Sequence, residues 1–320
     1  DYHTANLDPW DLPNGGSASR ETKERKPKQH RTGYVTNEDR QHFFVDDLKH
    51  PYNEDRRFDW IRGYHVGGKS LMWARMSFRW SAMDFEANKK DGHGVDWPIR
   101  YKDLKPWYEI VERFVGISGK NENLPQLPDS IFTPPMELNC VEKEFQKGIA
   151  ENYDDRQIIH GRCANLTGDE IREGRSNCQF RNRCIRGCPY GGYFSSNSCT
   201  LPAAERAGGM TLRPHSIVHE IIYDDTKKLA TGVRVIDAET NEKMVFYAKV
   251  IFCCASTVAT TSILLQSKSE RFPNGLGNDS GELGHNMMDH HFKVGASGTF
   301  EGHEEDYYKG RKPNGFFVPR

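Results

Sequence analysis

Three cysteines lie close together in the segment CQFRNRCIRGCPYGG, which spans residues 178–192. They are Cys178, Cys184 and Cys188, spaced C-x5-C-x3-C, and a proline follows the last of them. Thiols this close in sequence form disulfides, bind zinc or bind an iron–sulfur cluster. They can also have no chemical role, because cysteine is a small residue that packs well in protein interiors.

The spacing favours a cluster over the other uses. Zinc sites commonly combine tight C-x2-C pairs with a distant partner pair, and nothing equivalent occurs elsewhere in this chain. Cys163 could supply a fourth ligand only across a long loop. Disulfide pairing among three close cysteines would leave one over. A compact loop of thiolates that ends in Cys-Pro is typical of ferredoxin-like cluster motifs.

The residues around this loop suggest electrostatic and structural roles. Positive charge near an anionic cluster raises its reduction potential and attracts a redox partner, although solvated surface arginines are an equal alternative. Cys199 is expected to be structural. Cys253 and Cys254, in the apolar run KVIFCCAS, are expected to be small buried residues of a strand. The flanking arginines are Arg175, Arg181, Arg183 and Arg186.

Two further segments carry groups that could bind a ligand. Gly67 and Gly68 in HVGGKS let the backbone approach a bulky ligand, and amides at such a turn can hold an anion. Taken alone, the pair is more simply an ordinary turn. The segment GHNMMDHH contains His285, His290 and His291. Adjacent histidines are more often surface or hydrogen-bonded residues than metal ligands, so we predict no metal site there.

The elements that would position these groups change in type along the chain. Residues 1–57 are polar and rich in charge, Gly and Pro, which predicts a loop-rich segment without regular structure. Apolar residues at helical spacing predict helices over 101–117 and 137–153, and a short helix should end at Gly208. Alternating patterns then predict a strand meander, followed by a closing helix. The expected strands cover 210–224, 230–239 and 243–256, and the closing helix covers 256–267.

Length and charge restrict the class of protein. The chain has 320 residues and a formal net charge of −1, so its composition does not call for nucleic acid or an acidic membrane as a partner. No run of about 18 apolar residues predicts a membrane span. The first residues have neither a basic start nor an apolar stretch, so no signal peptide is predicted. Eight cysteines in a chain this long do not indicate a disulfide-dense mini-domain.

Three longer blocks, in this order, resemble one family. They are RGYHVGGKSLMW, DWPIRYKDLKPWYEIVERFVGISG and RFPNGLGNDSGELGHNMMDHH. The chain resembles the glucose–methanol–choline (GMC) flavoprotein oxidoreductases from about residue 58 to about residue 300. The likeness is greatest to the branch with an iron–sulfur cluster in the flavin subunit, the FAD-dependent glucose dehydrogenases and glucoside 3-dehydrogenases. The resemblance implies an α/β fold with α+β elements. It divides the chain into a polar segment (1–57), a central FAD-binding domain (58–270) that includes the cysteine loop (163–199), and the start of a substrate-binding domain (271–320).

The resemblance also implies which residues meet the flavin. The VGGKS turn corresponds to the family's flavin loop, although Lys69 departs from the common Gly, Ser or Thr. Met72 stands where related pyranose oxidases carry a histidine that bonds covalently to the flavin, so FAD should be held non-covalently. Trp73 and Ala74 should lie near the reactive edge of the flavin. The other implied cofactor contacts are Gly67, Gly68, Ser70, Val218, Ala255, Ser256, Asn286 and His290.

For the cysteine loop, the resemblance implies a three-iron cluster bound by Cys178, Cys184 and Cys188, which passes electrons onward from FAD. The sequence departs from the pattern at one place. Relatives have the first ligand one residue closer to the C-x3-C pair, beside a second cysteine, whereas Gln179 follows Cys178 here.

The implied activity is oxidation of CH–OH groups of sugars or glucosides, with hydride transfer to flavin N5 and electron transfer through the cluster to an external acceptor. The family's catalytic histidine is expected beyond Arg320, and its early G-x-G-x-x-G fingerprint is absent from this sequence. We therefore expect a piece of a longer protein that has no catalytic residue of its own, binds FAD poorly and does not turn over.

Implied partners are a small accessory subunit and a cytochrome or quinone-linked acceptor. The implied location is periplasmic or membrane-associated through that subunit, with a cytoplasmic location as the alternative. Two other functions remain open. One is a GMC alcohol or polyol dehydrogenase, or an oxidase, with structural cysteines. The other is a zinc-stabilised binding module. Metal content separates them: iron with sulfide, zinc, or neither.

Overall fold

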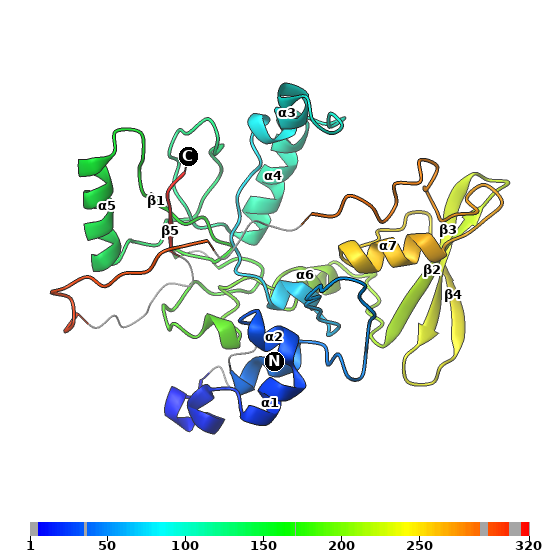
Figure 1. Ribbon diagram of the computed structural model, residues 1–320, viewed down its shortest axis with the longest axis horizontal. Helices are drawn as coiled ribbons and strands as arrows, with labels where there is room; N and C mark the ends of the chain where they lie inside the picture. Colours follow the sequence, from blue (N-terminus) through cyan, green and yellow to red (C-terminus); the bar gives the residue numbers. More distant parts are fainter. Residues whose placement is uncertain (1–5, 35–36, 170, 289–293, 307–314, 320) are drawn as a thin grey trace. The chain divides into compact units, whose positions relative to one another are not determined.

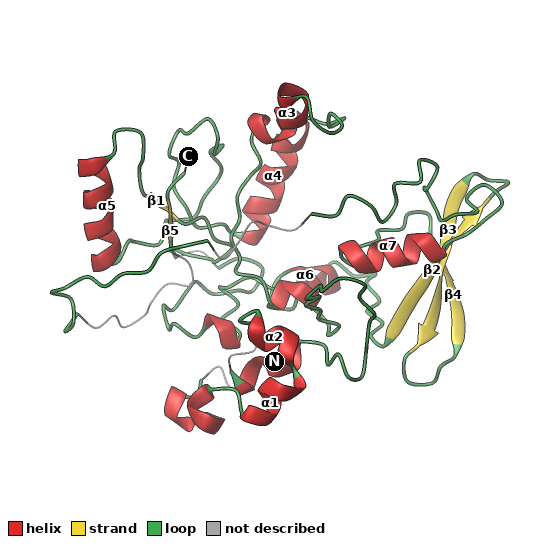
Figure 2. Cartoon of the chain, viewed as in Figure 1, coloured by secondary structure: helices red, strands yellow, loops and turns green. Residues whose placement is uncertain are grey.

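The computed structural model describes residues 6–34, 37–169, 171–288, 294–306 and 315–319. The chain forms two compact units, one of residues 1–210 with 299–320 and the other of residues 211–298. Both helices and sheets are present, which confirms the mixed fold class (Figures 1 and 2). The boundaries of these two units differ from those of the predicted segments 1–57, 58–270 and 271–320. The predicted segments describe the domains of the family and stay a prediction.

The N-terminal segment is folded, so the prediction of a structureless loop was wrong. Ser19 caps the first α-helix by accepting a 3.1 Å hydrogen bond from the Thr22 amide. Two of the residues that face inward are polar: Gln29 is completely buried, and the Lys26 ammonium donates to the carbonyls of Gln41 and Phe44. Because the Lys26 ammonium and the side-chain nitrogen of Gln29 both find internal acceptors, a polar sequence packs here. The elements are η1 (Pro9–Asp11), η2 (Pro13–Gly16), α1 (Arg20–Arg25), α2 (Pro27–Arg31) and η3 (Glu38–Phe43).

The rest of the first unit contains the predicted helices. A capping box between Asn139 and Glu142 starts α5, and a positive φ at Gly116 ends α4. Two small hydrophobic clusters lie in this unit: Ala18, Phe43 and Phe44 form one, and Val115, Ile117 and Ala164 form the other. The elements are η4 (Gly68–Leu71), α3 (Ala82–Asp91), α4 (Tyr101–Val115), α5 (Cys140–Asn152), β1 (Ile159–His160), η5 (Cys184–Arg186), α6 (Thr200–Arg206) and β5 (Phe316–Phe317).

The second unit is an antiparallel meander with one helix, as predicted. β2 (Ser216–Asp224), β3 (Leu229–Asp237) and β4 (Lys243–Tyr247) lie in that order, with Val218 opposite Val235 and Val235 opposite Met244. Helix α7 (Thr257–Gln266) ends beside β2, where the Ser267 hydroxyl accepts a 2.8 Å hydrogen bond from the Ile221 amide. That bond joins the helix end to the strand.

The last predicted strand is shorter than expected. β4 ends at Tyr247, and Phe252 is 85% exposed. Cys253 is half-buried and Cys254 is exposed, so their interpretation as buried strand residues was wrong. A strand needs a neighbour to accept its backbone hydrogen bonds, and no described strand pairs with residues 249–256.

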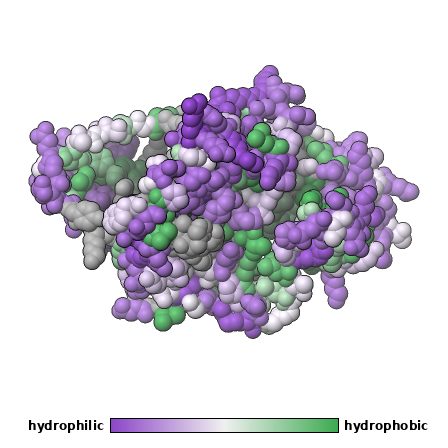
Figure 3. Space-filling model, turned by 90° about the horizontal axis from the view of Figure 1, so that it is seen from below, coloured by the Kyte–Doolittle hydropathy of each residue, from purple (hydrophilic) through white to green (hydrophobic). Residues whose placement is uncertain are grey.

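The surface agrees with the polar composition of the sequence, in which 28% of the residues are charged. Hydrophilic residues make up most of the face seen in Figure 3, with hydrophobic residues in smaller groups between them. Within the described part of the chain, no helix is both long and apolar enough to cross a membrane.

Candidate cofactor and metal sites

The glycine turn at residues 65–68 has a conformation that needs glycine. Gly67 has φ 93°, and a Cβ atom there would lie 2.5 Å from the Asn197 side-chain oxygen. Gly68 also has a positive φ, and a Cβ atom there would meet nothing within 4 Å. The turn closes through a 2.8 Å hydrogen bond from the Gly68 amide to the His65 carbonyl. Its backbone is therefore tight on one side and open on the other.

Ser70 joins this turn to a distant loop. Its hydroxyl donates to the Gly67 carbonyl at 2.6 Å and accepts from the Ser196 amide at 2.9 Å. The Asn197 side-chain amide donates to the Val66 carbonyl at 3.2 Å. These bonds fix the turn against residues 196–197, which lie near the C-terminal end of the cysteine loop (163–199).

Two buried polar atoms beside the turn have no hydrogen-bond partner among the described residues. They are Nε2 of His65 and the side-chain oxygen of Asn197. Burial lowers the pKa of His65, so its imidazole is neutral near pH 7. An unsatisfied buried polar atom costs roughly 1–3 kcal/mol. A polar ligand at the turn would remove that cost.

The three residues after the turn face different surroundings. Met72 packs onto the cluster of Ala18, Phe43 and Phe44. Trp73 is 37% exposed and meets Phe194 edge-on, and Ala74 is exposed. The two predicted reactive-edge residues, Trp73 and Ala74, are therefore accessible to a ligand. Met72, another predicted cofactor contact, packs against a hydrophobic cluster instead.

The other predicted cofactor residues belong to the second unit. The contacts predicted in the first unit and those predicted in the second are therefore described separately. Val218 lies in β2, and Ala255 and Ser256 immediately precede α7, where Ser256 has a φ of 71°. Such a φ is rare for a residue other than glycine and is often found at functional turns. The Asn286 side chain donates to Glu282 at 2.7 Å. His290 lies outside the described residues.

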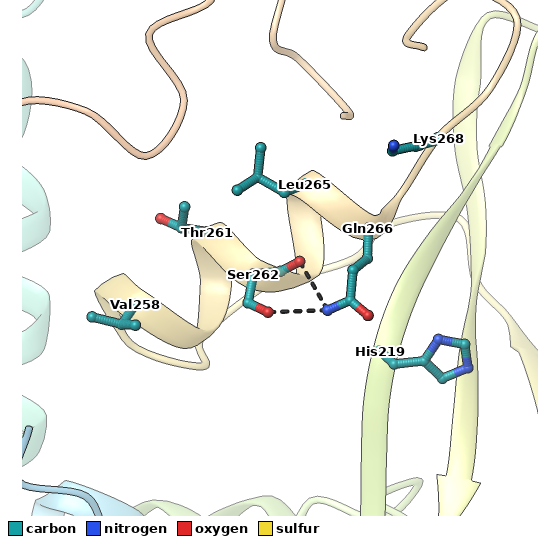
Figure 4. A pocket seen from close by; sticks show the side chains of 7 residues that line it. All are labelled: His219, Val258, Thr261, Ser262, Leu265, Gln266 and Lys268. Atoms are coloured by element: carbon teal, nitrogen blue, oxygen red, sulfur yellow. Dashed lines mark hydrogen bonds between the residues drawn. The ribbon is translucent and has the colours of Figure 1, made fainter. Parts of the chain in front are cut away.

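The second unit also contains a hollow of about 610 Å³ between α7 and His219 of β2. Figure 4 shows its lining, where Gln266 donates two hydrogen bonds to Ser262. None of the predicted site residues lines it, although Val218 precedes His219 in the same strand. The hollow therefore adds nothing to the predicted cofactor contacts.

The cysteine loop is held by main-chain pairing. The Cys178 amide donates to the Leu166 carbonyl at 2.7 Å, and the Leu166 amide donates to the Gly192 carbonyl at 2.8 Å. A Cβ atom at Gly192 would lie 3.0–3.1 Å from the backbones of Ser176 and Cys178. Glycine therefore permits the two sides of the loop to approach this closely.

The three predicted metal ligands are half-buried and interact with one another. The pKa of the Cys184 thiol is raised to about 12, mainly by burial and then by negative charge on Cys178 and Cys188. Burial also raises the pKa of Cys178, against a hydrogen bond from Asn165. Among the described residues, the three sulfur atoms do not form a group tight enough to hold one ion. Zinc would need them within about 4 Å of one another, given Zn–S bonds of about 2.3 Å.

Arg75, which the sequence did not indicate, is buried against Tyr193 and Phe194 of the cysteine loop. It is 5% exposed, and burial lowers its pKa, whereas negative charge at Tyr193, Cys163 and, least of the three, Cys184 acts in the opposite direction. Its guanidinium lies 4.0 Å from the ring centroid of Tyr193 and donates to the carbonyls of Trp73 and Phe194. The one sequence signal for a buried role of Arg75 was its position within the largely apolar run LMWARM.

The flanking arginines are largely structural. Arg175 is 1% exposed and donates to the Cys199 sulfur at 3.0 Å and to the Val115 carbonyl at 2.7 Å. Arg186 is also buried, so the alternative of solvated arginines was wrong for these two. Cys199 is completely buried, in agreement with a structural role. Arg181, Arg183 and Arg186 each bond to residues 6–8.

Residues 13–292 match the family model described as GMC oxidoreductase. The chain belongs to the GMC oxidoreductase family. It is 29% identical over 243 residues to 2-methyl-1,2-propanediol dehydrogenase of Mycolicibacterium austroafricanum, covering 73% of this chain and 42% of that protein. It is 27% identical over 230 residues to the fructose dehydrogenase large subunit of Gluconobacter japonicus, covering 70% of this chain and 41% of that protein.

A solved structure, an FAD-dependent oxidoreductase from Chaetomium thermophilum, is similar with a TM-score of 0.41 and 16% identity, over 67% of this chain and 36% of that one. This GMC chain spans less than half the length of the curated relatives it matches. The family resemblance inferred from the three sequence blocks is thus confirmed, whereas the iron–sulfur branch stays a prediction.

Proposed function

We propose that this GMC protein is an FAD-dependent oxidoreductase that acts on CH–OH groups of sugars or glucosides. The observation that carries the proposal is the tight glycine turn with two unpaired buried polar atoms, within a chain that matches the GMC family over residues 13–292. Two relatives are named as dehydrogenases of a propanediol and of fructose, which supports an alcohol or sugar as the substrate class.

The residues of the turn fit FAD. The open side of Gly68 lets the backbone approach a phosphate, and the His65 nitrogen and the Asn197 oxygen can each make one further hydrogen bond. Trp73 and Ala74 are exposed and can lie against an aromatic ring system. FAD would supply the hydride-accepting N5 atom, while this turn binds and orients it.

Non-covalent binding follows from Met72. A thioether cannot form the bond that a histidine forms at this position in the related enzymes, and Met72 is packed into the core. Denaturation of the protein should therefore release FAD as a free, chemically unchanged molecule.

The glycine turn provides the first prediction. Replacing Gly67 with alanine should cost about 1–2 kcal/mol for the left-handed conformation and should displace Asn197. We expect the Gly67→Ala protein to lose most of its bound FAD, measured as flavin released per polypeptide on denaturation of the native protein that carries this sequence.

A matched control is Gly148→Ala, since Gly148 lies in α5 and a Cβ atom there would meet nothing within 4 Å. This variant should keep its flavin. A Gly67→Ala protein that retains stoichiometric FAD at an unchanged melting temperature would remove the turn from the flavin site.

We further propose that Cys178, Cys184 and Cys188 bind a three-iron cluster through which electrons leave for an external acceptor. The thiols are close enough to interact electrostatically but do not form a single-ion group, which suits a cofactor in which each thiolate meets a different iron. The charge of the buried Arg75 interacts with Cys184, and positive charge of this kind raises the reduction potential of an anionic cluster.

The substrate and the partners are also proposals. A cytochrome or quinone-linked acceptor would receive the electrons, in the periplasm or at a membrane. A small accessory subunit would be a further partner. The name of the fructose dehydrogenase relative as a large subunit supports a partner subunit. The propanediol dehydrogenase relative favours a second candidate, an alcohol or polyol dehydrogenase.

Anaerobic titration with substrate tests the proposed activity. Loss of flavin absorbance on addition of sugars or glucosides, and not of simple alcohols or diols, is the expected result. Bleaching only by alcohols or diols would favour the second candidate. No bleaching by either class would contradict the proposed CH–OH oxidation.

A further inference from the structure

Three side chains from two distant segments converge at the first residue of α5. Cys140, His303 and Asp306 each place one ligand atom so that all three atoms lie within 4.8 Å of one another. Among the described residues, this is the one such group of three. It lies apart in sequence from both the glycine turn and the cysteine loop. We propose that these three residues form a zinc site that fastens residues 299–306 to α5.

The position of Cys140 is fixed by the start of the helix. The Asn139 side chain accepts a 2.8 Å hydrogen bond from the Glu142 amide, and the Glu142 carboxylate accepts a 2.9 Å hydrogen bond from the Asn139 amide. This capping box sets the backbone on both sides of Cys140. The thiol is half-buried and does not form a disulfide.

The other two side chains come from one turn. The Asp306 amide donates to the His303 carbonyl at 3.2 Å, and this turn brings Nδ1 of His303 to 2.7 Å from the Asp306 carboxylate. The His303 side chain is 24% exposed, and that of Asp306 is 55% exposed. The group therefore has one face toward the protein and one toward solvent, from which a metal ion can enter.

The chain returns to α5 a few residues later. β5 pairs with β1, and Phe316 packs against Phe145 of α5 with ring centroids 5.3 Å apart (Figure 1). This packing holds residues 316–317 beside α5 independently of any metal. A metal ion at Cys140, His303 and Asp306 would add a link between α5 and segment 299–306.

The ligand set selects zinc over harder cations. Thiolate, imidazole and carboxylate are all common zinc ligands, and bond lengths of about 2.0–2.3 Å place neighbouring ligand atoms about 3–4 Å apart. Magnesium and calcium prefer oxygen ligands throughout, so a thiol argues against them. One thiolate and one carboxylate neutralise the charge of Zn²⁺, and the neutral imidazole completes a three-ligand set with an open fourth position for water.

The expected consequence is structural. A link between Cys140 and His303 closes a loop of well over a hundred residues, and closing a long loop removes conformational entropy from the unfolded chain. Zinc should therefore raise the melting temperature of the native protein by mass action. This proposal does not depend on FAD or on the iron–sulfur cluster.

Cobalt titration of the metal-free protein tests the site, because Co²⁺ replaces zinc and absorbs when a thiolate binds it. We expect a thiolate-to-cobalt band that zinc abolishes, that Cys140→Ser removes and that Cys184→Ser and Cys254→Ser retain. Asp306→Asn changes an exposed side chain and should leave the fold intact. It should weaken zinc affinity at least about 100-fold, since even changing a hydrogen-bond partner of a metal ligand costs roughly 10–100-fold.

Two results would overturn the proposal. The first is a cobalt band that survives Cys140→Ser and disappears in Cys184→Ser, which would place all thiolate binding in the cysteine loop. The second is an equal zinc-dependent rise in melting temperature in the parent protein and in Asp306→Asn. Either result would leave His303 and Asp306 as an ion pair beside a cysteine.

Discussion

Replacing Glu112 with glutamine is expected to destabilise the protein by about 3–5 kcal/mol, because the buried Arg79 would lose its counter-charge. The two side chains form a bidentate salt bridge. Nε of Arg79 donates to Oε1 of Glu112 at 2.9 Å, and Nη2 of Arg79 donates to Oε2 of Glu112 at 2.5 Å. The side chain of Arg79 is 2% exposed and that of Glu112 is 10% exposed, so water cannot replace the lost partner. The pair joins the extended segment after the glycine turn to α4.

Urea denaturation measures the change, with Glu144→Gln as the control. Glu144 is exposed on α5, so the same substitution there should change stability by no more than about 0.5 kcal/mol. The double variant Arg79→Met with Glu112→Leu should recover much of the loss, because apolar residues replace a buried ion pair at little cost. A loss below about 1 kcal/mol for Glu112→Gln would show that the pair is not buried as described.

Changing Cys184 to serine is expected to abolish iron binding. Negative charge on both Cys178 and Cys188 acts on its thiol, so the three cysteines belong to one proposed cluster site. Serine keeps the size of the side chain but is a poor ligand for iron, and the two remaining thiols cannot hold a cluster that needs three. Iron and acid-labile sulfide in anaerobically purified Cys184→Ser should fall to background.

Two control variants make this result specific. Cys254→Ser changes an exposed cysteine, and Cys140→Ser changes the proposed zinc site, so both should retain their iron. Unchanged iron in Cys184→Ser would contradict the cluster assignment, whereas equal loss in all three variants would point to general damage to the fold.

The elements that the sequence predicted well carry local signals. α4 and α5 have apolar residues at helical spacing, and α5 has a capping box within its first turn. The meander of β2, β3 and β4 follows from alternation and turn residues. Residues 1–57 were missed because Gln29 and Lys26 are buried with internal partners, which composition cannot reveal. Residues 249–256 were wrongly predicted as strand because their apolar character does not show whether a neighbouring strand is available to pair with them.

The candidate sites were predictable to the extent that they are local. Gly67 and Gly68 are adjacent, and the three loop cysteines lie within eleven positions. Arg75 could not be placed against Tyr193 in advance, nor Asn197 beside Gly67, because more than a hundred residues separate each pair. The same holds for Cys140 and His303. Only the folded chain brings these groups together.

The most direct test of the proposed function is the content of flavin, iron and acid-labile sulfide in the native polypeptide that carries this sequence, purified anaerobically and examined by electron paramagnetic resonance. We expect stoichiometric FAD that is released on denaturation, together with cluster iron and sulfide that give a resonance signal. Flavin without iron would contradict the electron route through Cys178, Cys184 and Cys188, and would favour an oxidase or alcohol dehydrogenase with structural cysteines. A protein with neither flavin nor iron would contradict the proposed function itself.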